Sequence, residues 1–344
     1  MLVFKNRIGL GLVRGTKVFL DRGVSTIQAL RKLRKQEREI AALRAILADR
    51  DAGEDVGISP ENIIWVFGSG RTGSSWLTFM MRALPNHSRW NEPLIGKLFG
   101  DLYYDKRDDA RAVIRQDRKH FILGNEYREI WLSSIRNLLL NGAIARFPER
   151  AEKGYLVIKE PHGSPGAPLL MEALPESRMI FLVRDPRDVA ASALDAHRKG
   201  SRPSKRRRMK RPELFEKDTR ADEKPNSFVE SRAKTYLRDT KFIEQAYEAH
   251  KGHKVLVRYE DLRADTLGTM KRIYSILEIS VDERELDRAI EQHSWENIPE
   301  DKKGPGTIRR KATPGGWRED LTPEQVEIVE RENAQILDQY YAQD

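Results

Sequence analysis

Short apolar-rich runs alternate with longer amphipathic stretches along most of this chain. Four such runs, at 63–67, 155–158, 179–183 and 254–258, predict strands. Continuous apolar runs of this length are typical of parallel strands that are buried on both faces. Helical spacing of apolar residues predicts helices over 74–84, 126–140, 187–198, 227–250, 265–277 and 322–340. Because strands and helices alternate, we predict an α/β fold with a doubly wound parallel sheet flanked by helices.

A basic segment, residues 1–56, precedes the first predicted strand and predicts a helical N-terminal extension. Leu33, Ile40 and Leu47 repeat every seven residues. This spacing fits either an amphipathic helix packed on its own domain or a short coiled coil that makes a homodimer. The apolar run 8–13, flanked by Lys and Arg, fits either a solvated basic tail or peripheral contact with a membrane surface.

A second basic region, 198–223, interrupts the remaining domain, 57–344. Residues 198–211 contain nine Lys or Arg and no acid. Three interpretations stay open: a solvated loop, a lid that binds the acceptor, or a nucleic-acid or nuclear-targeting segment. The run contains no aromatic residues for base stacking, so we do not expect nucleic acid to be a partner.

The amino-acid composition excludes several classes of function. The 344 residues include no cysteine, which excludes disulfides, thiolate catalysis and the usual structural zinc sites, and we expect no metal. No apolar stretch approaches the ~20 residues of a membrane span, and the beginning of the sequence lacks a secretory signal. We therefore expect a cytoplasmic enzyme. The net charge of +9 favours anionic partners such as an acidic glycan or a lipid.

A glycine-containing loop follows the run 63–67 and precedes a predicted helix. Strand, tight loop and helix in this order aim backbone N–H groups at a phosphate, which makes the fold P-loop-like. The frame Gly68-x4-Gly73 fits a Walker A loop, but Ser74 occupies the position of its lysine, and the cation is Arg71 instead. This change suits a nucleotide without a γ-phosphate.

The run 179–183 ends in a second charged motif. Arg184 lies at the predicted carboxyl end of this strand, where α/β folds bind ligands. Asp185 suits the cap and Pro186 the first turn of the next helix. Ser192 then lies about two turns along that helix.

These motifs resemble the sulfotransferases that use 3′-phosphoadenosine 5′-phosphosulfate, in particular the bacterial branch near the protein-tyrosine and carbohydrate enzymes. The resemblance covers about Ile63 to Trp317. It implies that the donor's 5′-phosphosulfate is bound by the loop residues Gly70, Arg71, Thr72, Gly73, Ser74, Ser75 and Trp76. It likewise implies that the donor's 3′-phosphate is bound by Arg184 and Ser192, and that Tyr259 lies near the nucleotide.

A third block, 310–317, is similar to the basic loop that closes over the 3′-phosphate in that family. Arg310 and Lys311 would supply the charge, although Ala312 and Gly316 replace the family's usual Gly and Asp. Trp76 either stacks on adenine, as in the family, or fills the core.

For catalysis, the resemblance assigns Arg71 and Lys159 to the leaving phosphate. Lys159 ends a predicted strand and begins a Lys-acid-Pro segment found in the same branch. Two residues compete as general base. Glu92 lies 21 residues after Arg71, the separation in the protein-tyrosine branch, and nearby Trp90 is expected to raise the pKa of its carboxyl. His162 is the alternative, by analogy with the small-molecule branch, but it lies one residue further from the lysine than in those enzymes.

The predicted function is sulfuryl transfer from 3′-phosphoadenosine 5′-phosphosulfate to a hydroxyl or amine of a carbohydrate, a lipid or another small molecule. Two other classes stay open: a P-loop nucleotide kinase or phosphotransferase, and a non-catalytic polyanion-binding protein on the same fold. The missing lysine after Gly73 and the lack of a clear Mg²⁺-binding Asp after an apolar strand disfavour the kinase.

Overall fold

A computed structural model of the chain describes residues 57–104, 120–150, 153–198, 200–201, 220–304, 307, 311 and 313–342. The N-terminal extension, most of the basic insertion and Arg310 lie outside the described residues. The expected coiled coil, homodimer, membrane contact and lid therefore stay predictions.

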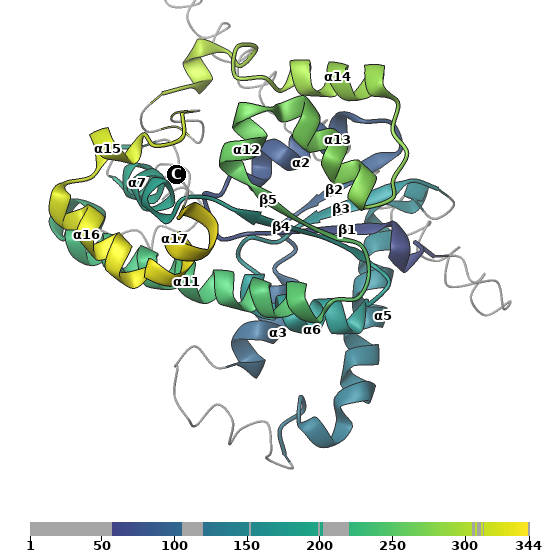
Figure 1. The fold of residues 1–344 in the computed structure, drawn as a ribbon. Helices are drawn as coiled ribbons and strands as arrows, with labels where there is room; N and C mark the ends of the chain where they lie inside the picture. Colours follow the sequence, from purple (N-terminus) through teal and green to yellow (C-terminus); the bar gives the residue numbers. More distant parts are fainter. Residues whose placement is uncertain are drawn as a thin grey trace, which may run out of the picture.

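Five parallel strands form one sheet in the order β2-β3-β1-β4-β5 (Figure 1). The strands are β1 (Ile63–Phe67), β2 (His87–Asn91), β3 (Tyr155–Lys159), β4 (Arg178–Val183) and β5 (Lys254–Arg258). β1 is central, with β3 on one side and β4 on the other, so the chain winds outward in both directions. This confirms the predicted doubly wound parallel sheet.

Helices cover both faces of the sheet. One face carries α2 (Ser74–Ala83), α12 (Tyr259–Ala264), α13 (Thr266–Ile276) and α14 (Glu283–Gln292); the other carries α3 (Ile95–Tyr103), α5 (Arg128–Arg146), α6 (Ala167–Ala173) and α11 (Pro225–Ala249). The remaining helices are α7 (Pro186–His197), α10 (Arg220–Glu223), α15 (Trp317–Asp320), α16 (Pro323–Glu332) and α17 (Ala334–Tyr341). Short 3-10 turns are η1 (Pro60–Asn62), η2 (Asn125–Tyr127), η3 (Pro148–Arg150), η4 (Ser164–Gly166) and η5 (Glu300–Lys302). None of the described helices is long and apolar enough to cross a bilayer.

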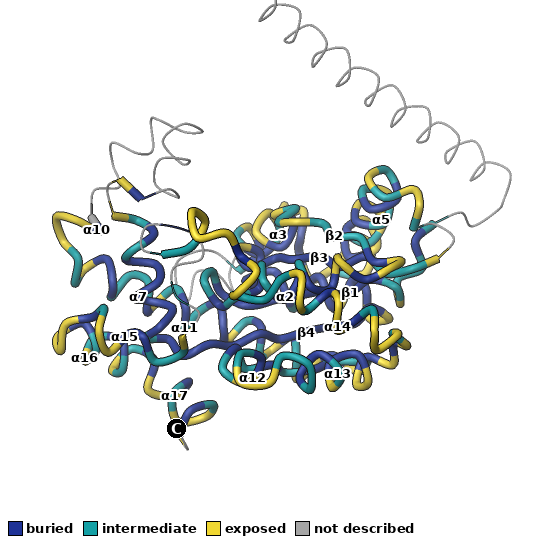
Figure 2. The backbone as a smooth tube through the Cα atoms, turned by 90° about the horizontal axis from the view of Figure 1, so that it is seen from above, coloured by how far each residue is buried: buried dark blue, intermediate teal, exposed yellow. Residues whose placement is uncertain are grey.

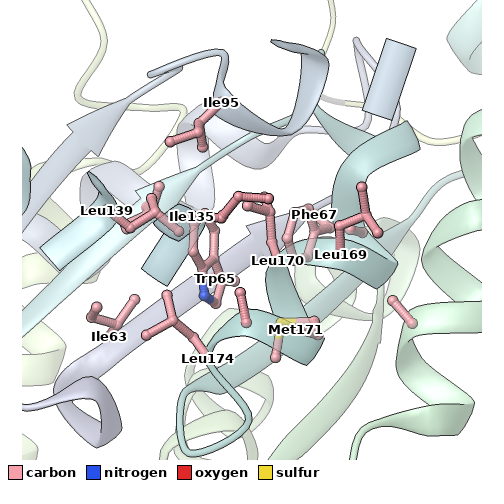
Figure 3. Packing of buried hydrophobic residues seen from close by; sticks show 14 of the residues in the cluster. Ile63, Trp65, Phe67, Ile95, Ile135, Leu139, Leu169, Leu170, Met171 and Leu174 are labelled. Carbon is pink, nitrogen blue, oxygen red and sulfur yellow. The ribbon is translucent and has the colours of Figure 1, made fainter. Parts of the chain in front are cut away.

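The sheet separates two apolar cores, because successive side chains of a strand point to opposite faces. Along β1, Ile63, Trp65 and Phe67 enter the core beneath α5 and α6, and Ile64 and Val66 enter the core beneath α2 and α13. All five residues are fully buried. Figure 3 shows the first core, and in Figure 2 the central strands β1 and β4 are coloured as buried. This packing fixes the carboxyl ends of the central strands, where the predicted site lies.

The structure differs from the sequence-based elements in four respects. β2 was not predicted, because His87–Asn91 is an edge strand of mainly polar, half-buried residues without an apolar run. The predicted helix 265–277 is α13, preceded by the separate short helix α12. The predicted helix 322–340 is interrupted at buried Asn333, whose Nδ2 donates to the carbonyls of Val329 (3.2 Å) and Ala233 (3.4 Å). The helices α3, α6 and α14 were also not predicted.

Candidate active site

The loop between β1 and α2 has the tight geometry that the sequence predicts. Arg71 has φ 77° and Gly73 has φ 92°. The Thr72 hydroxyl donates to the carbonyl of Ser69 (2.9 Å), and the Ser69 hydroxyl donates to Asp239 on α11 (3.1 Å). α2 begins at Ser74, and no described side chain caps it. Backbone amides at an uncapped helix start are a binding site for an anion.

Gly73 is required by its surroundings as well as by its φ. A Cβ at this position would lie 2.5 Å from the ring of Tyr259. Tyr259 is buried at the end of β5, and its ring packs edge-on to Trp76 at 6.1 Å between centroids. The structure therefore places Tyr259 against the loop, and its position near the nucleotide stays a prediction.

The loop after β1 contacts the motif that begins at Arg184 through two arginines, Arg71 and Arg184. Arg71 donates from Nε to the hydroxyl of Ser192 (2.9 Å), and Arg184 donates from Nη1 to the carbonyl of Arg71 (3.2 Å). Arg184 stacks over Tyr259 at 4.3 Å. The Nε atom of Arg184 is buried and donates to no acceptor in the described part of the chain. A buried donor without a partner is costly, so this atom is suited to an anionic oxygen.

Asp188, which the sequence did not point to, connects the third block to this cluster. Its carboxylate is fully buried, lies 3.6 Å from Arg184 Nη2, and accepts from the backbone amides of Gly315 (2.9 Å) and Trp317 (3.0 Å). Lys311, one of the predicted phosphate ligands, is instead paired with acids of α15, Glu319 at 2.8 Å and Asp320 at 3.2 Å. The available signal was the position of Asp188 in the charged motif 184–188 that follows the apolar run 179–183.

The predicted catalytic acid and lysine are in direct contact. Glu92 Oε1 lies 2.5 Å from Lys159 Nζ, and the Glu92 amide donates to the Lys159 carbonyl (2.8 Å). β2 and β3 create this contact by pairing Asn91 with Lys159 in register. The Lys159 side chain is 4% exposed and that of Glu92 is 31% exposed. The pair therefore has one buried member and one that solvent reaches.

The expectation that an apolar neighbour raises the pKa of Glu92 is wrong. Burial does raise it, but the hydrogen bond and charge of Lys159, with the charges of His162 and Arg89, outweigh burial and lower the pKa below its ordinary value. Burial lowers the pKa of Lys159, an effect that the hydrogen bond and charge of Glu92 oppose. Glu92 is thus ionised at neutral pH, as a proton acceptor must be.

His162, the competing base, lies at the same end of the sheet. It is exposed, and a Cβ on Gly70 would lie 3.6 Å from its Cε1. Its charge acts on both Glu92 and Asp239. His162 therefore lies beside the loop, and Glu92 is hydrogen-bonded to the strand-end lysine, Lys159.

The side chain of Trp76 contacts the neighbouring residues His293 and Arg263. Its indole N–H donates to the carbonyl of His293 (2.9 Å), and the guanidinium of Arg263 lies 5.2 Å from its ring. The ring is half-buried, so stacking on adenine stays a prediction. Among the described residues, no three His, Asp or Glu side chains are grouped as a metal site.

The chain is similar to known sulfotransferases in sequence and in fold. A rat (Rattus norvegicus) protein, Sulfotransferase 2A6, is 26% identical over 175 residues, which are 45% of this chain and 55% of that protein. The matched part of this chain thus spans about half the length of that relative. The crystal structure of sulfotransferase STF9 from Mycobacterium avium superposes with a TM-score of 0.50 at 14% identity, over 87% of this chain and 81% of that one. Mouse sulfotransferase SULT7A1, solved complexed with PAP, gives a TM-score of 0.49 at 14% identity, over 82% of this chain and 89% of that one.

The STF9 structure shows similarity of fold alone, and family membership follows from the sequence. The model of the Sulfotransferase family matches residues 64–283, which include the loop after β1, the Glu92–Lys159 pair and the Arg184 motif. This match covers more than half of the chain, and the chain therefore belongs to the sulfotransferase family.

Proposed function

We propose that this chain transfers a sulfuryl group from 3′-phosphoadenosine 5′-phosphosulfate to a hydroxyl or amine of a carbohydrate, a lipid or another small molecule. The observation that carries the proposal is the joined arginine cluster. Arg184 donates to the Arg71 carbonyl, and Arg71 donates to Ser192. One connected set of donors thus lies beside the uncapped start of α2, suited to a nucleotide with phosphates at two positions.

The residues fit such a donor. The buried Nε of Arg184 lacks an acceptor in the described chain, and Asp188 holds the block 313–317 beside it. Arg184 and Ser192 would hold the 3′-phosphate, and the loop amides with Arg71 would hold the 5′-phosphosulfate. Arg310 and Lys311 would complete the 3′-phosphate site. For Lys311, this requires leaving Glu319 and Asp320.

Glu92 and Lys159 would perform the proton and charge chemistry. Glu92 accepts the proton of the attacking hydroxyl or amine while the acceptor atom bonds to sulfur. The bond between sulfur and the bridging phosphate oxygen breaks, and its electron pair stays on that oxygen. Lys159 and Arg71 stabilise this developing charge. The lowered pKa of Glu92 keeps it ready to accept the proton.

A transfer assay tests the proposal directly. The purified chain is incubated with donor labelled in its sulfuryl group and with panels of carbohydrates, lipids and phenols, without added metal. We expect label to move to at least one acceptor and the bisphosphate nucleotide to form in equal amount. If no panel accepts label but [γ-³²P]ATP with Mg²⁺ labels an acceptor, the chain is a phosphotransferase instead.

A further inference from the structure

Glu160 is a fully buried carboxyl group to which the proposed chemistry gives no role. It follows Lys159, and its amide donates to the Val66 carbonyl (3.1 Å), so it extends β3 by one residue. Its Oε1 accepts from the amide of Gly96 at the start of α3 (3.4 Å). Its Oε2 is buried without a hydrogen-bond partner in the described chain. A buried carboxyl group in this position is costly, which points to a role.

The backbone is tightly packed around this carboxyl group, where the start of α3 meets the turn after β3. A Cβ on Gly96 would lie 2.3 Å from the Gly163 carbonyl oxygen, and a Cβ on Gly163 would lie 2.7 Å from the Glu160 carboxyl carbon. The first turn of α3 and the turn after β3 are therefore in backbone contact. The Glu160 side chain lies between them.

The segment that enters α3 carries the proposed base in an unfavourable backbone conformation. Glu92 has φ 53° and Leu94 has φ 62°, both left-handed. Such a conformation is unfavourable for a residue with a side chain and persists only where its surroundings fix it. The Glu92 amide is fixed by the Lys159 carbonyl (2.8 Å). At the other end of the segment, Glu160 holds Gly96 in α3.

We infer that Glu160 is a positioning residue: its carboxyl group anchors the first turn of α3 and thereby holds Glu92 against Lys159. The anchoring contact is a property of the fold. Its effect on turnover rests on the proposed sulfuryl transfer. Hydrogen exchange measures the anchoring contact, and kinetics measures its effect on turnover.

The protonation of Glu160 gives the anchor a pH dependence. Burial raises the pKa of Glu160 to about 7; backbone amides of α3 oppose burial, and Glu92 adds to it. The other charged groups here are Lys159, His162 in the same turn, and Asp239 on α11, which packs on that turn. Because the packed junction raises this pKa, protonation favours the packed junction and ionisation favours its opening. Since the ordinary pKa of this carboxyl group is 4.5, the anchor is tightest below about pH 4.5, loosens as the pH rises to about 7 and changes little above that.

The kinetic test compares two substitutions with a control. Glu160→Ala removes the acceptor, and we expect kcat to fall roughly 10–100-fold, the scale of a misplacement of about 1 Å. Affinity for the product nucleotide should stay within about threefold of wild type, which also shows that the variant is folded. Glu160→Gln keeps a neutral acceptor oxygen and should retain kcat within about threefold. The control, Glu176→Gln, alters an exposed acid that pairs with Arg136 and should change neither quantity.

Hydrogen exchange tests the anchor without any substrate. Protection factors of the α3 amides, corrected for intrinsic rates, should fall in wild type as pH rises from 5 to 7 and stay flat in Glu160→Gln. Glu160→Ala should reduce this protection at both pH values. Unchanged α3 protection in Glu160→Ala, or parallel pH profiles in wild type and Glu160→Gln, would overturn the inference. If wild type transfers no sulfuryl group but the α3 profiles behave as expected, only the proposed function fails.

Discussion

Replacing Glu92 with glutamine is expected to lower turnover by roughly 10²–10⁴-fold, the usual loss when a general base is removed. The amide keeps the shape of the side chain but accepts no proton. The base acts in the transition state, so affinity for the product nucleotide should change little. Steady-state kinetics and calorimetry with the bisphosphate nucleotide measure the two quantities.

His162→Ala is the decisive comparison, because His162 lies at the same end of the sheet and its charge acts on Glu92. We expect it to alter kcat far less than Glu92→Gln. If Glu92→Gln keeps near-normal turnover while His162→Ala abolishes it, the base is His162. The Glu92–Lys159 contact would then serve only to orient the lysine.

Arg184→Ala is expected to weaken binding of the 3′-phosphorylated nucleotide by roughly 30- to 1,000-fold. This corresponds to about 2–4 kcal/mol, the scale for removing one partner of a buried charge-assisted hydrogen bond. Binding of adenosine 5′-phosphosulfate, which lacks the 3′-phosphate, should be affected much less. Calorimetric titration of both ligands measures the difference.

Arg136→Ala provides the matched control for Arg184→Ala. Arg136 is a partly exposed arginine on α5 that pairs with Glu176, away from the loop after β1. This variant should leave both affinities unchanged. Equal losses for both ligands in Arg184→Ala would mean that Arg184 supports the loop as a whole, through its bond to the Arg71 carbonyl, and does not select the 3′-phosphate.

The central strands could be predicted from the sequence because their residues form continuous apolar runs. β1, β3 and β4 are buried on both faces and therefore read as continuous apolar runs. β2 has one fully buried residue, His87, and its identity as a strand follows from pairing with β3. Such an edge strand carries no local signal. Its register nevertheless sets the contact between Glu92 and Lys159.

The candidate site could be predicted as a set of motifs but not as a set of contacts. Strand ends of a parallel sheet meet at one edge, which is why Arg184 and the loop after β1 could be expected near each other. The bond from Arg71 to Ser192, the role of Asp188 and the anchoring by Glu160 depend on side-chain directions that no spacing specifies. Whether the pKa of Glu92 is raised or lowered also depended on a contact, because the effect of Lys159 on this pKa outweighs the effect of burial.

Calorimetry can show whether this site selects a 3′-phosphorylated adenine nucleotide without a metal ion, as we propose. The chain is titrated with adenosine 3′,5′-bisphosphate in the presence of a chelator, and separately with ATP and Mg²⁺. We expect saturable one-to-one binding of the bisphosphate, at least tenfold tighter than binding of ATP with Mg²⁺. Arg184→Ala should lose this preference. Tighter binding of ATP with Mg²⁺, or no binding of the bisphosphate, would contradict the proposal.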